Sequence, residues 1–231
     1  MSLAPVCLLA GGRGTRLGTA VAETPKPILP VAGAPFLVHS LALLARAGAT
    51  RAVVCVGYLG ERIEAEIGHE RFGIELAYAY DPPDLAGTAG AVRGALHLLG
   101  DRFLVLYGDT YLRIDYAAVD RAQADSGRLA LMTVLRNEGR WDTSNAEYAD
   151  GVVKAYDKRA PTPAMRWIDY GLGVLTPAAL DAAPEDDDLA GVYHALAARG
   201  ALAGYEATER FYEIGTPGAL AEAEAFLVGA R

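Results

Sequence analysis

Residues 3–17, LAPVCLLAGGRGTRL, place a short apolar run directly before a cluster of glycines. The run over residues 3–10 has no alternation of polar and apolar residues, which is typical of a strand buried on both faces. The glycines that follow predict a tight turn whose backbone N–H groups can approach an anion closely. Arg16 adds a guanidinium that suits phosphate oxygens. The stretch therefore predicts an open α/β sheet with a phosphate site at a strand's carboxyl end.

The chain after this turn alternates between helical and strand-like patterns. Strands are predicted over residues 51–57, 74–80, 103–107 and 129–135, and helices over residues 35–47, 60–67, 88–99 and 115–124. Such a β-α-β-α order predicts a Rossmann-like, GT-A-like α/β fold. We expect a mixed, mostly parallel central sheet with helices on both faces.

The pattern changes after about residue 137. Asp150-Gly151 lies between two short strand-like segments and predicts a hairpin. A last helix is predicted to begin with Thr216 as N-cap and Pro217 in its first turn. Further strands are expected over residues 167–175, 201–205 and 210–214, and helices over residues 177–182 and 189–198. No long linker divides these segments, so we expect a single domain over residues 1–231.

Composition narrows the classes of partner. The chain has 231 residues, of which 52% are hydrophobic, and a net charge of −8, which argues against nucleic acid and against membrane binding through a basic patch. No apolar stretch reaches the length of a membrane span, and the first residues lack the features of a signal peptide. Cys7 and Cys55 lie in apolar runs and are expected to be buried thiols. These observations predict a cytoplasmic protein.

Two familiar phosphate-binding motifs do not match the glycine turn. The dinucleotide fingerprint requires a third glycine where this chain has Leu17, and the P-loop requires a Gly-Lys pair followed by Ser or Thr. A different pattern appears when the turn is considered together with Lys26 between two prolines. The combined string LAGGRGTRL…TPKPILPVAGAPFL resembles the signature of the sugar-1-phosphate nucleotidyltransferases. That family includes heptose-1-phosphate and mannose-1-phosphate guanylyltransferases and the short N-acetylmuramate-1-phosphate uridylyltransferases.

The resemblance implies an enzyme that transfers a nucleoside monophosphate from a nucleoside triphosphate to a sugar 1-phosphate and releases pyrophosphate. A nucleotide-binding part is expected over about residues 1–136 and a sugar-binding part over about residues 137–231. In overall resemblance the chain is most like the heptose-1-phosphate and mannose-1-phosphate guanylyltransferases, which make GDP-heptose and GDP-mannose. Uridylyl- and thymidylyltransferases follow closely, so the base and the sugar stay open. A monomer or homodimer is expected, since the chain lacks the long extension that larger relatives use for assembly.

The resemblance also assigns residues for the nucleotide and the metal. The triphosphate and base are expected to contact Gly11, Gly12, Gly14, Thr15, Arg16, Gly87, Thr88 and Ala89. Arg16, Lys26 and Asp109 are the expected catalytic residues. Asp109 follows a buried strand, and a carboxylate there can hold Mg²⁺ beside substrate phosphates. Glu213 stands where the family has its second metal-binding aspartate.

Residues for the sugar phosphate come from the later segments. Those implied are Lys26, Asn145, Asp157, Lys158, Tyr170 and Gly171. From the residues alone, Asp157-Lys158 also fits a solvated charged pair after a hairpin. The acidic run over residues 185–188 is expected to be a solvated loop, in which Asp188 caps the next helix.

Two other functions stay open at this point. Glu213 is one methylene longer than the family's aspartate, which leaves room for a catalytically silent relative that only binds nucleotide sugars. A nucleotidyltransferase acting on a non-sugar phosphate such as phosphocholine also fits the opening motif. A glycosyltransferase would need an Asp-x-Asp motif at a strand end, and the nearest candidate, residues 186–188, lies in the acidic loop instead.

Overall fold

Four parallel strands form the centre of the sheet: β1 (Val6–Leu9), β4 (Arg51–Val56), β6 (Ile74–Tyr80) and β7 (Phe103–Tyr107). β1 pairs with β4 on one side and with β7 on the other, and β4 pairs with β6. The computed structural model that shows this arrangement describes residues 3–14, 17, 24–82 and 87–229. All four strands were expected from the sequence, because each is a short apolar run between turn residues.

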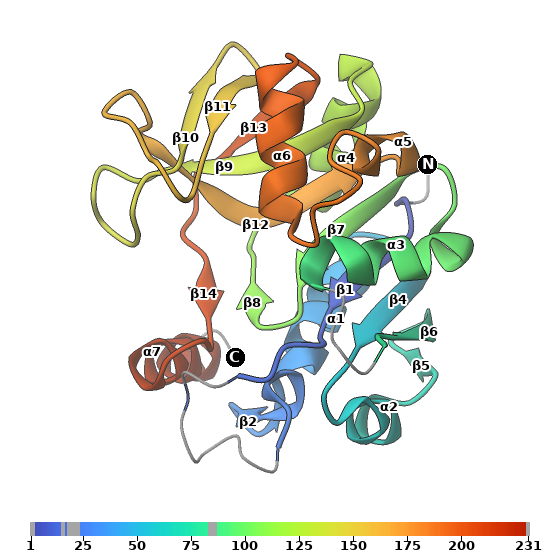
Figure 1. The fold of residues 1–231 in the computed structure, drawn as a ribbon. Coiled ribbons are helices and arrows are strands. Elements are labelled where there is room, and N and C mark those ends of the chain that lie inside the picture. The colour runs from blue at the N-terminus through green and yellow to red at the C-terminus, as the bar shows by residue number, and fades with distance from the viewer. Residues whose placement is uncertain (1–2, 15–16, 18–23, 83–86, 230–231) are drawn as a thin grey trace.

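The remaining strands extend the same sheet and make it mixed. β12 (Trp167–Leu175) is antiparallel to both β7 and β9 (Ala130–Arg136), whereas β13 (Leu202–Ala207) is parallel to β9. The order in the described chain is β10-β11-β13-β9-β12-β7-β1-β4-β6-β5 (Figure 1). β10 (Ala146–Ala149) and β5 (Glu70–Arg71) end this order, and β11 (Val152–Tyr156) lies between β10 and β13. The expected hairpin joins β10 to β11, with positive φ at both Asp150 and Gly151.

Helices cover both faces of the sheet. Helices α1 (Phe36–Arg46), α2 (Gly60–Ile67) and α4 (Tyr116–Ser126) pack on the face that carries Leu8 and Val54. The opposite face, which carries Cys7 and Val53, is covered by α3 (Gly87–Leu99), α5 (Pro177–Leu180) and α6 (Leu189–Ala198). Strand residues alternate between two apolar layers, so burial on both faces explains the continuous apolar runs.

A third, smaller apolar cluster holds the last helix, α7 (Pro217–Gly229). Its Ala223 and Leu227 pack near Phe36 and near β2 (Pro30–Val31), below the main sheet in Figure 1. The Thr216 hydroxyl accepts a hydrogen bond from the Ala219 N–H at 3.2 Å, so the predicted N-cap is confirmed.

Two expectations for this part of the chain were wrong. The strand expected over residues 210–214 is only β14 (Tyr212–Glu213), which pairs with β8 (Thr110–Tyr111) and not with the main sheet. Pro35 does not lie inside the first helical turn, because it ends the short strand β3 (Ala34–Pro35) and precedes α1. Proline suits both places, and only the pairing of β2 with β3 decides between them.

None of the helices built from the described residues is both long and apolar enough to span a membrane.

Buried side chains of the parallel strands are expected to contribute much of the free energy of unfolding. Leu106 in β7 is fully buried in the layer beneath α1, whereas Leu129 is 39% exposed. We expect Leu106→Ala to lower the free energy of unfolding by about 2–5 kcal/mol, through lost apolar burial and a residual cavity. Leu129→Ala is the matched control and should cost less than about 1 kcal/mol. Urea unfolding measures both, and similar losses at the two positions would contradict the assigned core.

Candidate active site

Three loops that follow parallel strands meet at one edge of the sheet. Gly11 follows β1, Asp81 follows β6, and Asp109 follows β7. The chain runs from β1 to β4 and β6 on one side, then crosses through α3 to β7 on the other side of β1. The strand order therefore reverses at β1. Open α/β sheets bind ligands in the crevice outside the carboxyl ends of the strands at such a point.

A cavity of about 220 Å³ lies at this reversal, and we call it the nucleotide cavity. It is lined by six of the residues predicted from the sequence and by Asp81, which was not predicted. The predicted ones are Gly11, Gly12, Lys26, Gly87, Thr88 and Asp109.

The ammonium of Lys26 and the carboxylate of Asp109 form an ion pair in the nucleotide cavity. Lys26 Nζ lies 2.7 Å from Asp109 Oδ2, and the two side chains are 12% and 27% exposed. Lys26 opens the 3₁₀ turn Lys26–Ile28, directly after Pro25. The second carboxylate oxygen, Oδ1, accepts a hydrogen bond from the Thr110 hydroxyl at 3.3 Å. A cation and a carboxylate thus face the same space, where they can contact a phosphate and a metal ion respectively.

The glycine loop supplies close backbone approach at the start of the cavity. A Cβ atom on Gly11 would lie 2.8 Å from Asp81 Oδ2 and 3.2 Å from the backbone nitrogen of Gly57, so a larger residue does not fit there. Gly14 has φ 65°, and its carbonyl accepts a bond from the Leu17 N–H at 3.0 Å. Two of the predicted phosphate contacts, Thr15 and Arg16, lie outside the described residues.

The carboxylates fit a metal ion that binds together with a nucleotide. Glu213 lies on β14 opposite Thr110, and the Ile214 N–H donates to the Asp109 carbonyl at 3.1 Å. Asp109 and Glu213 are therefore neighbours through the backbone. Within the described ranges, no three His, Cys, Asp or Glu side chains are grouped to hold a metal ion. Mg²⁺ is commonly bound by one or two carboxylates plus substrate phosphates, and the Asp109 carboxylate, which lines the nucleotide cavity, suits that arrangement.

Asp81 is a functional candidate that the sequence analysis missed. Its carboxylate lines the nucleotide cavity beside Gly11. Burial raises the pKa of this carboxyl above its ordinary value. The available signal was its place directly after a predicted parallel strand, where open sheets present their ligand-binding groups.

The start of α3 is engaged by the acidic loop over residues 185–188. The Ala89 N–H donates to the Asp187 carbonyl at 2.8 Å. The Thr88 hydroxyl donates to Asp188 Oδ1 at 2.9 Å and accepts from the Leu189 N–H at 2.8 Å. In this structure these groups bind the acidic loop, while Thr88 still lines the nucleotide cavity. The predicted contact of Thr88 and Ala89 with the nucleotide stays a prediction.

The same loop also fixes the residue at the head of α3. Gly87 has φ 66°, and a Cβ atom there would overlap the Asp187 carbonyl. The Arg93 guanidinium donates to the Asp186 carbonyl at 2.8 Å, so the backbone of the loop is docked on α3. Glu185, Asp187 and Asp188 are exposed, as expected for a solvated acidic loop. Asp188 does cap α6, as predicted, by accepting from the Ala190 N–H at 3.0 Å.

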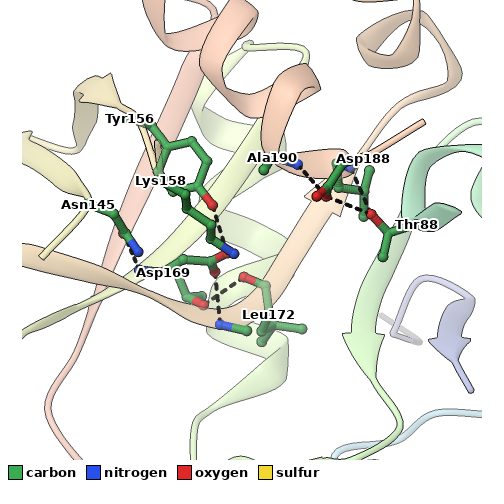
Figure 2. Close-up of polar contacts among 11 residues, drawn as sticks. Thr88, Asn145, Tyr156, Lys158, Asp169, Leu172, Asp188 and Ala190 are labelled. Atoms are coloured by element: carbon green, nitrogen blue, oxygen red, sulfur yellow. Dashed lines mark hydrogen bonds and ion pairs between the residues drawn. The ribbon is translucent and has the colours of Figure 1, made fainter. Parts of the chain in front are cut away.

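A second group of polar residues lies beneath the β10–β11 hairpin, and Figure 2 shows its contacts. Its centre is Asp169, whose side chain is 8% exposed and lies 3.6 Å from Lys158 Nζ. Asp169 Oδ2 accepts from the Tyr156 hydroxyl at 3.3 Å, and Oδ1 accepts from the Gly171 N–H at 3.0 Å. The Asn145 side chain accepts from the Asp169 N–H at 3.0 Å. We call Asn145, Tyr156, Lys158 and Asp169 the acceptor-side cluster.

Asn145, Lys158 and Gly171 were all predicted to bind the sugar phosphate, and the structure places them together. The residue that they surround is Asp169, which was not predicted. The Asp157 carboxylate is turned onto its own loop, where it accepts from the backbone N–H groups of Ala160 and Arg159. These bonds hold the pKa of Asp157 below its ordinary value. Neighbouring residues of a strand point to opposite faces.

That alternation separates Tyr170 from Asp169. The Tyr170 ring is 1% exposed and packs edge-on against Phe211 at 6.1 Å. Its side chain therefore belongs to the apolar layer and faces away from the acceptor-side cluster.

The raised pKa of Asp81 has a consequence for stability. The native state holds the Asp81 proton more tightly than the unfolded state, so stability falls as pH rises from about 3.8 through the raised pKa. Asp81→Asn removes this titration. We expect the melting temperature of Asp81→Asn to exceed that of the unmodified protein by more at pH 7 than at pH 3. Thermal unfolding at both pH values tests this, with the exposed Asp101→Asn as control. A difference in melting temperature that is no larger at pH 7 than at pH 3 would contradict the raised pKa of Asp81.

Comparison with known proteins finds a family match and several relatives. Residues 6–160 match the family model described as nucleotidyl transferase. N-acetylmuramate alpha-1-phosphate uridylyltransferase of Neisseria meningitidis is 41% identical over 113 residues, covering 48% of this chain and 49% of that protein. D-glycero-alpha-D-manno-heptose 1-phosphate guanylyltransferase of Campylobacter jejuni is 30% identical over 152 residues, which cover 65% of this chain and 67% of that protein. The chain thus spans about half the length of the first relative and about two thirds of the second.

Solved structures share the fold. HddC from Yersinia pseudotuberculosis superposes with a TM-score of 0.78 at 21% identity, covering 97% of this chain and all of that one. A Bacillus anthracis protein in complex with sucrose superposes with a TM-score of 0.85 at 20% identity, covering 97% of this chain and 95% of that one. At this identity the likeness concerns the fold alone. The family model, which matches more than half of the chain, goes further: this protein belongs to the nucleotidyl transferase family.

Proposed function

We propose that the protein transfers a nucleoside monophosphate from a nucleoside triphosphate to a sugar 1-phosphate, releasing pyrophosphate. The observation that carries the proposal is the Lys26–Asp109 pair, which faces the nucleotide cavity where the strand order reverses. The acceptor-side cluster adds a second cation, Lys158, on the neighbouring part of the sheet. The names of the relatives, a uridylyltransferase and a guanylyltransferase for sugar 1-phosphates, support the same reaction class.

The reaction is an in-line displacement at phosphorus. An oxygen of the sugar phosphate attacks the α-phosphorus of the nucleotide, and a new P–O bond forms. The bond between the α-phosphorus and the bridging oxygen breaks, and pyrophosphate leaves with that electron pair. No general base is needed, because the attacking phosphate oxygen is already ionised at neutral pH. Catalysis of this kind rests on positioning and charge stabilisation.

Each charged group has a role in this scheme. Lys26 would neutralise phosphate oxygens in the nucleotide cavity, and Lys158 would hold the phosphate of the acceptor. Asp109 and Glu213 would hold Mg²⁺, which supplies charge stabilisation on the phosphates when bound. Arg16 is proposed to contact the triphosphate. We also propose that the reaction takes place in the cytoplasm, since both substrates are soluble phosphorylated metabolites, and that the protein acts as a monomer or homodimer.

We also propose that the nucleotide is GTP. The base would bind beside Asp81, which lines the nucleotide cavity together with Gly11 and with Thr88 at the start of α3. An ionised carboxylate only accepts hydrogen bonds. Guanine presents two adjacent donors, N1–H and the N2 amino group, whereas uracil presents one N–H between two carbonyl oxygens that a carboxylate repels. The Thr88 hydroxyl and the Ala89 N–H are already engaged by the acidic loop, so among the described lining residues we assign Asp81 to the base.

Removing the charge of Asp109 tests the reaction. We expect Asp109→Asn to reduce pyrophosphate release by at least about 100-fold, because the Mg²⁺ that would stabilise the developing negative charge loses its carboxylate ligand. The assay pairs GTP, UTP, dTTP, CTP and ATP with mannose, glucose, manno-heptose and N-acetylmuramate 1-phosphates and with phosphocholine, with and without EDTA.

Exposed Asp101→Asn provides the control and should keep the full rate. Release by Asp109→Asn at a near-normal rate would refute the metal assignment. Nucleotide binding with no release from any pair would favour a silent relative, and release with phosphocholine alone would favour the non-sugar acceptor.

The identity of the base has its own test. Asp81→Asn replaces one acceptor oxygen by a donor, so we expect kcat/KM for GTP to fall by about 10- to 100-fold. The kcat/KM values for the other nucleotides should change less, so the ratio of kcat/KM for GTP to kcat/KM for the others should fall. Steady-state kinetics with the five nucleotides at a fixed sugar phosphate measures this. Equal changes for all five would show that Asp81 does not read the base.

A further inference from the structure

Two carboxylates are candidate partners of the Lys158 ammonium: Asp157, beside it in the sequence, and Asp169 on β12. The Asp157 carboxylate is bound to its own loop, where Oδ1 accepts from the N–H groups of Arg159 at 2.7 Å and Ala160 at 2.9 Å. Oδ2 of Asp169 instead lies 3.6 Å from Lys158 Nζ. The geometry therefore selects the carboxylate that is more distant in the sequence.

Asp169 is held in place through both its side chain and its backbone. Oδ1 accepts from the Gly171 N–H at 3.0 Å, and Oδ2 accepts from the Tyr156 hydroxyl at 3.3 Å. The backbone N–H of Asp169 donates to the side-chain oxygen of Asn145 at 3.0 Å (Figure 2). Asn145 is itself buried. The position of the Asp169 carboxylate is therefore fixed before any ligand binds.

Lys158 has the freedom that Asp169 lacks. Its side chain is 46% exposed, and its ammonium also lies 5.9 Å from the centre of the Tyr156 ring. Fixing a long lysine side chain costs conformational entropy. An ion pair with a rigid carboxylate restricts the ammonium in advance, which lowers the entropy that is lost when a phosphate binds. The ammonium has three N–H donors, so the ion pair with Asp169 leaves donors for phosphate oxygens.

Direct contacts join Asp169 to the wall of the nucleotide cavity. Gly171 donates its N–H to the Asp169 carboxylate. A Cβ atom on Gly171 would lie 3.7 Å from the side chains of both Tyr107 and Thr110. Tyr107 lines the nucleotide cavity, and Thr110 follows Asp109 directly. The acceptor-side cluster and the nucleotide cavity therefore share a boundary at Gly171 and Tyr107.

We infer that Asp169 is a positioning residue, which orients the Lys158 ammonium toward the phosphate of the acceptor, and that Asp157 has no part in acceptor binding. The inference rests on the proposed function, in which Lys158 holds that phosphate. The family resemblance implies Asp157 instead, so the two assignments make different predictions for the same pair of variants.

Asp169→Asn and Asp157→Asn are a matched pair for the test. Asp169→Asn removes the charge that faces Lys158, whereas in both variants an amide oxygen remains to accept from the backbone N–H groups. With the sugar 1-phosphate that gives the highest kcat/KM, we expect Asp169→Asn to raise KM for that sugar phosphate by about tenfold or more. KM for the nucleotide should not change, and Asp157→Asn should leave both KM values unchanged.

Three results of these kinetics would overturn the inference. One is an unchanged or lower KM for the sugar phosphate in Asp169→Asn, since a lower value would mean that Asp169 competes with the phosphate for Lys158. Another is an equal rise in KM in Asp157→Asn. The third is an equal rise in KM for the nucleotide in Asp169→Asn, which would indicate a general disturbance of the site.

A variant of the partner residue tests whether Asp169 acts through Lys158. Lys158→Met keeps an unbranched side chain without the charge, at an exposed position. We expect Lys158→Met to raise KM for the sugar phosphate at least as much as Asp169→Asn does, and the double variant to show no further rise. A merely structural role of Asp169 would raise KM again in the double variant, and that result would overturn the inference.

Binding without catalysis separates this inference from the proposed function. Calorimetric titration with mannose, glucose, manno-heptose and N-acetylmuramate 1-phosphates, in the presence of α,β-methylene analogues of GTP and UTP, measures Kd when no pyrophosphate can be released. We expect Asp169→Asn and Lys158→Met to bind the preferred sugar phosphate about tenfold or more weakly, and Asp157→Asn to bind it normally.

The outcomes distinguish the two claims. This pattern of Kd values without pyrophosphate release from any substrate pair would refute the proposed reaction and support the role of Asp169. Pyrophosphate release with the same kinetics in Asp169→Asn and the unmodified enzyme would support the reaction and overturn the inference. Binding of none of the four sugar phosphates by the unmodified protein would overturn both claims.

Discussion

The position of β1 between two parallel strands is the constraint on which the site depends. Because β4 and β7 both hydrogen-bond to β1, the chain leaves β1 toward one side and later returns on the other. The loops after β1 and β7 therefore separate and open a crevice at the carboxyl edge of the sheet. Gly11 and Asp109 reach the same cavity for this reason, although nearly a hundred residues separate them in the sequence.

A short two-stranded ladder brings the last part of the chain to the same place. β14 pairs with β8, so Glu213 lies opposite Thr110 and the Ile214 N–H bonds the Asp109 carbonyl. The buried Ile214 and α7 then complete the third apolar cluster around Phe36. Packing of this cluster therefore supports both the Lys26 turn and the proposed second metal ligand, since both segments border it.

Docking of the acidic loop on α3 changes how the base can be recognised. A free helix N-terminus offers unpaired N–H groups to a ligand. Here the Ala89 N–H and the Thr88 hydroxyl are used within the protein, and Arg93 holds the loop by its backbone carbonyls. Among the described lining residues, we propose that the Asp81 carboxylate discriminates between bases. Its raised pKa follows from the same burial that shapes the cavity.

The sequence by itself determined most strands and helices before about residue 137, the glycine turn after β1, and the places of Lys26 and Asp109. These follow from local signals: apolar runs, glycines with little steric restriction, and a carboxylate at a strand end. Only the tertiary structure decided that Asp169 and not Asp157 faces Lys158, that Tyr170 belongs to the core, and that Thr88 is engaged by the acidic loop. The first two depend on strand alternation and register, and the third on a contact between residues a hundred positions apart. Such long-range contacts leave no periodic pattern in the sequence, because they are fixed by the packing of whole elements against each other.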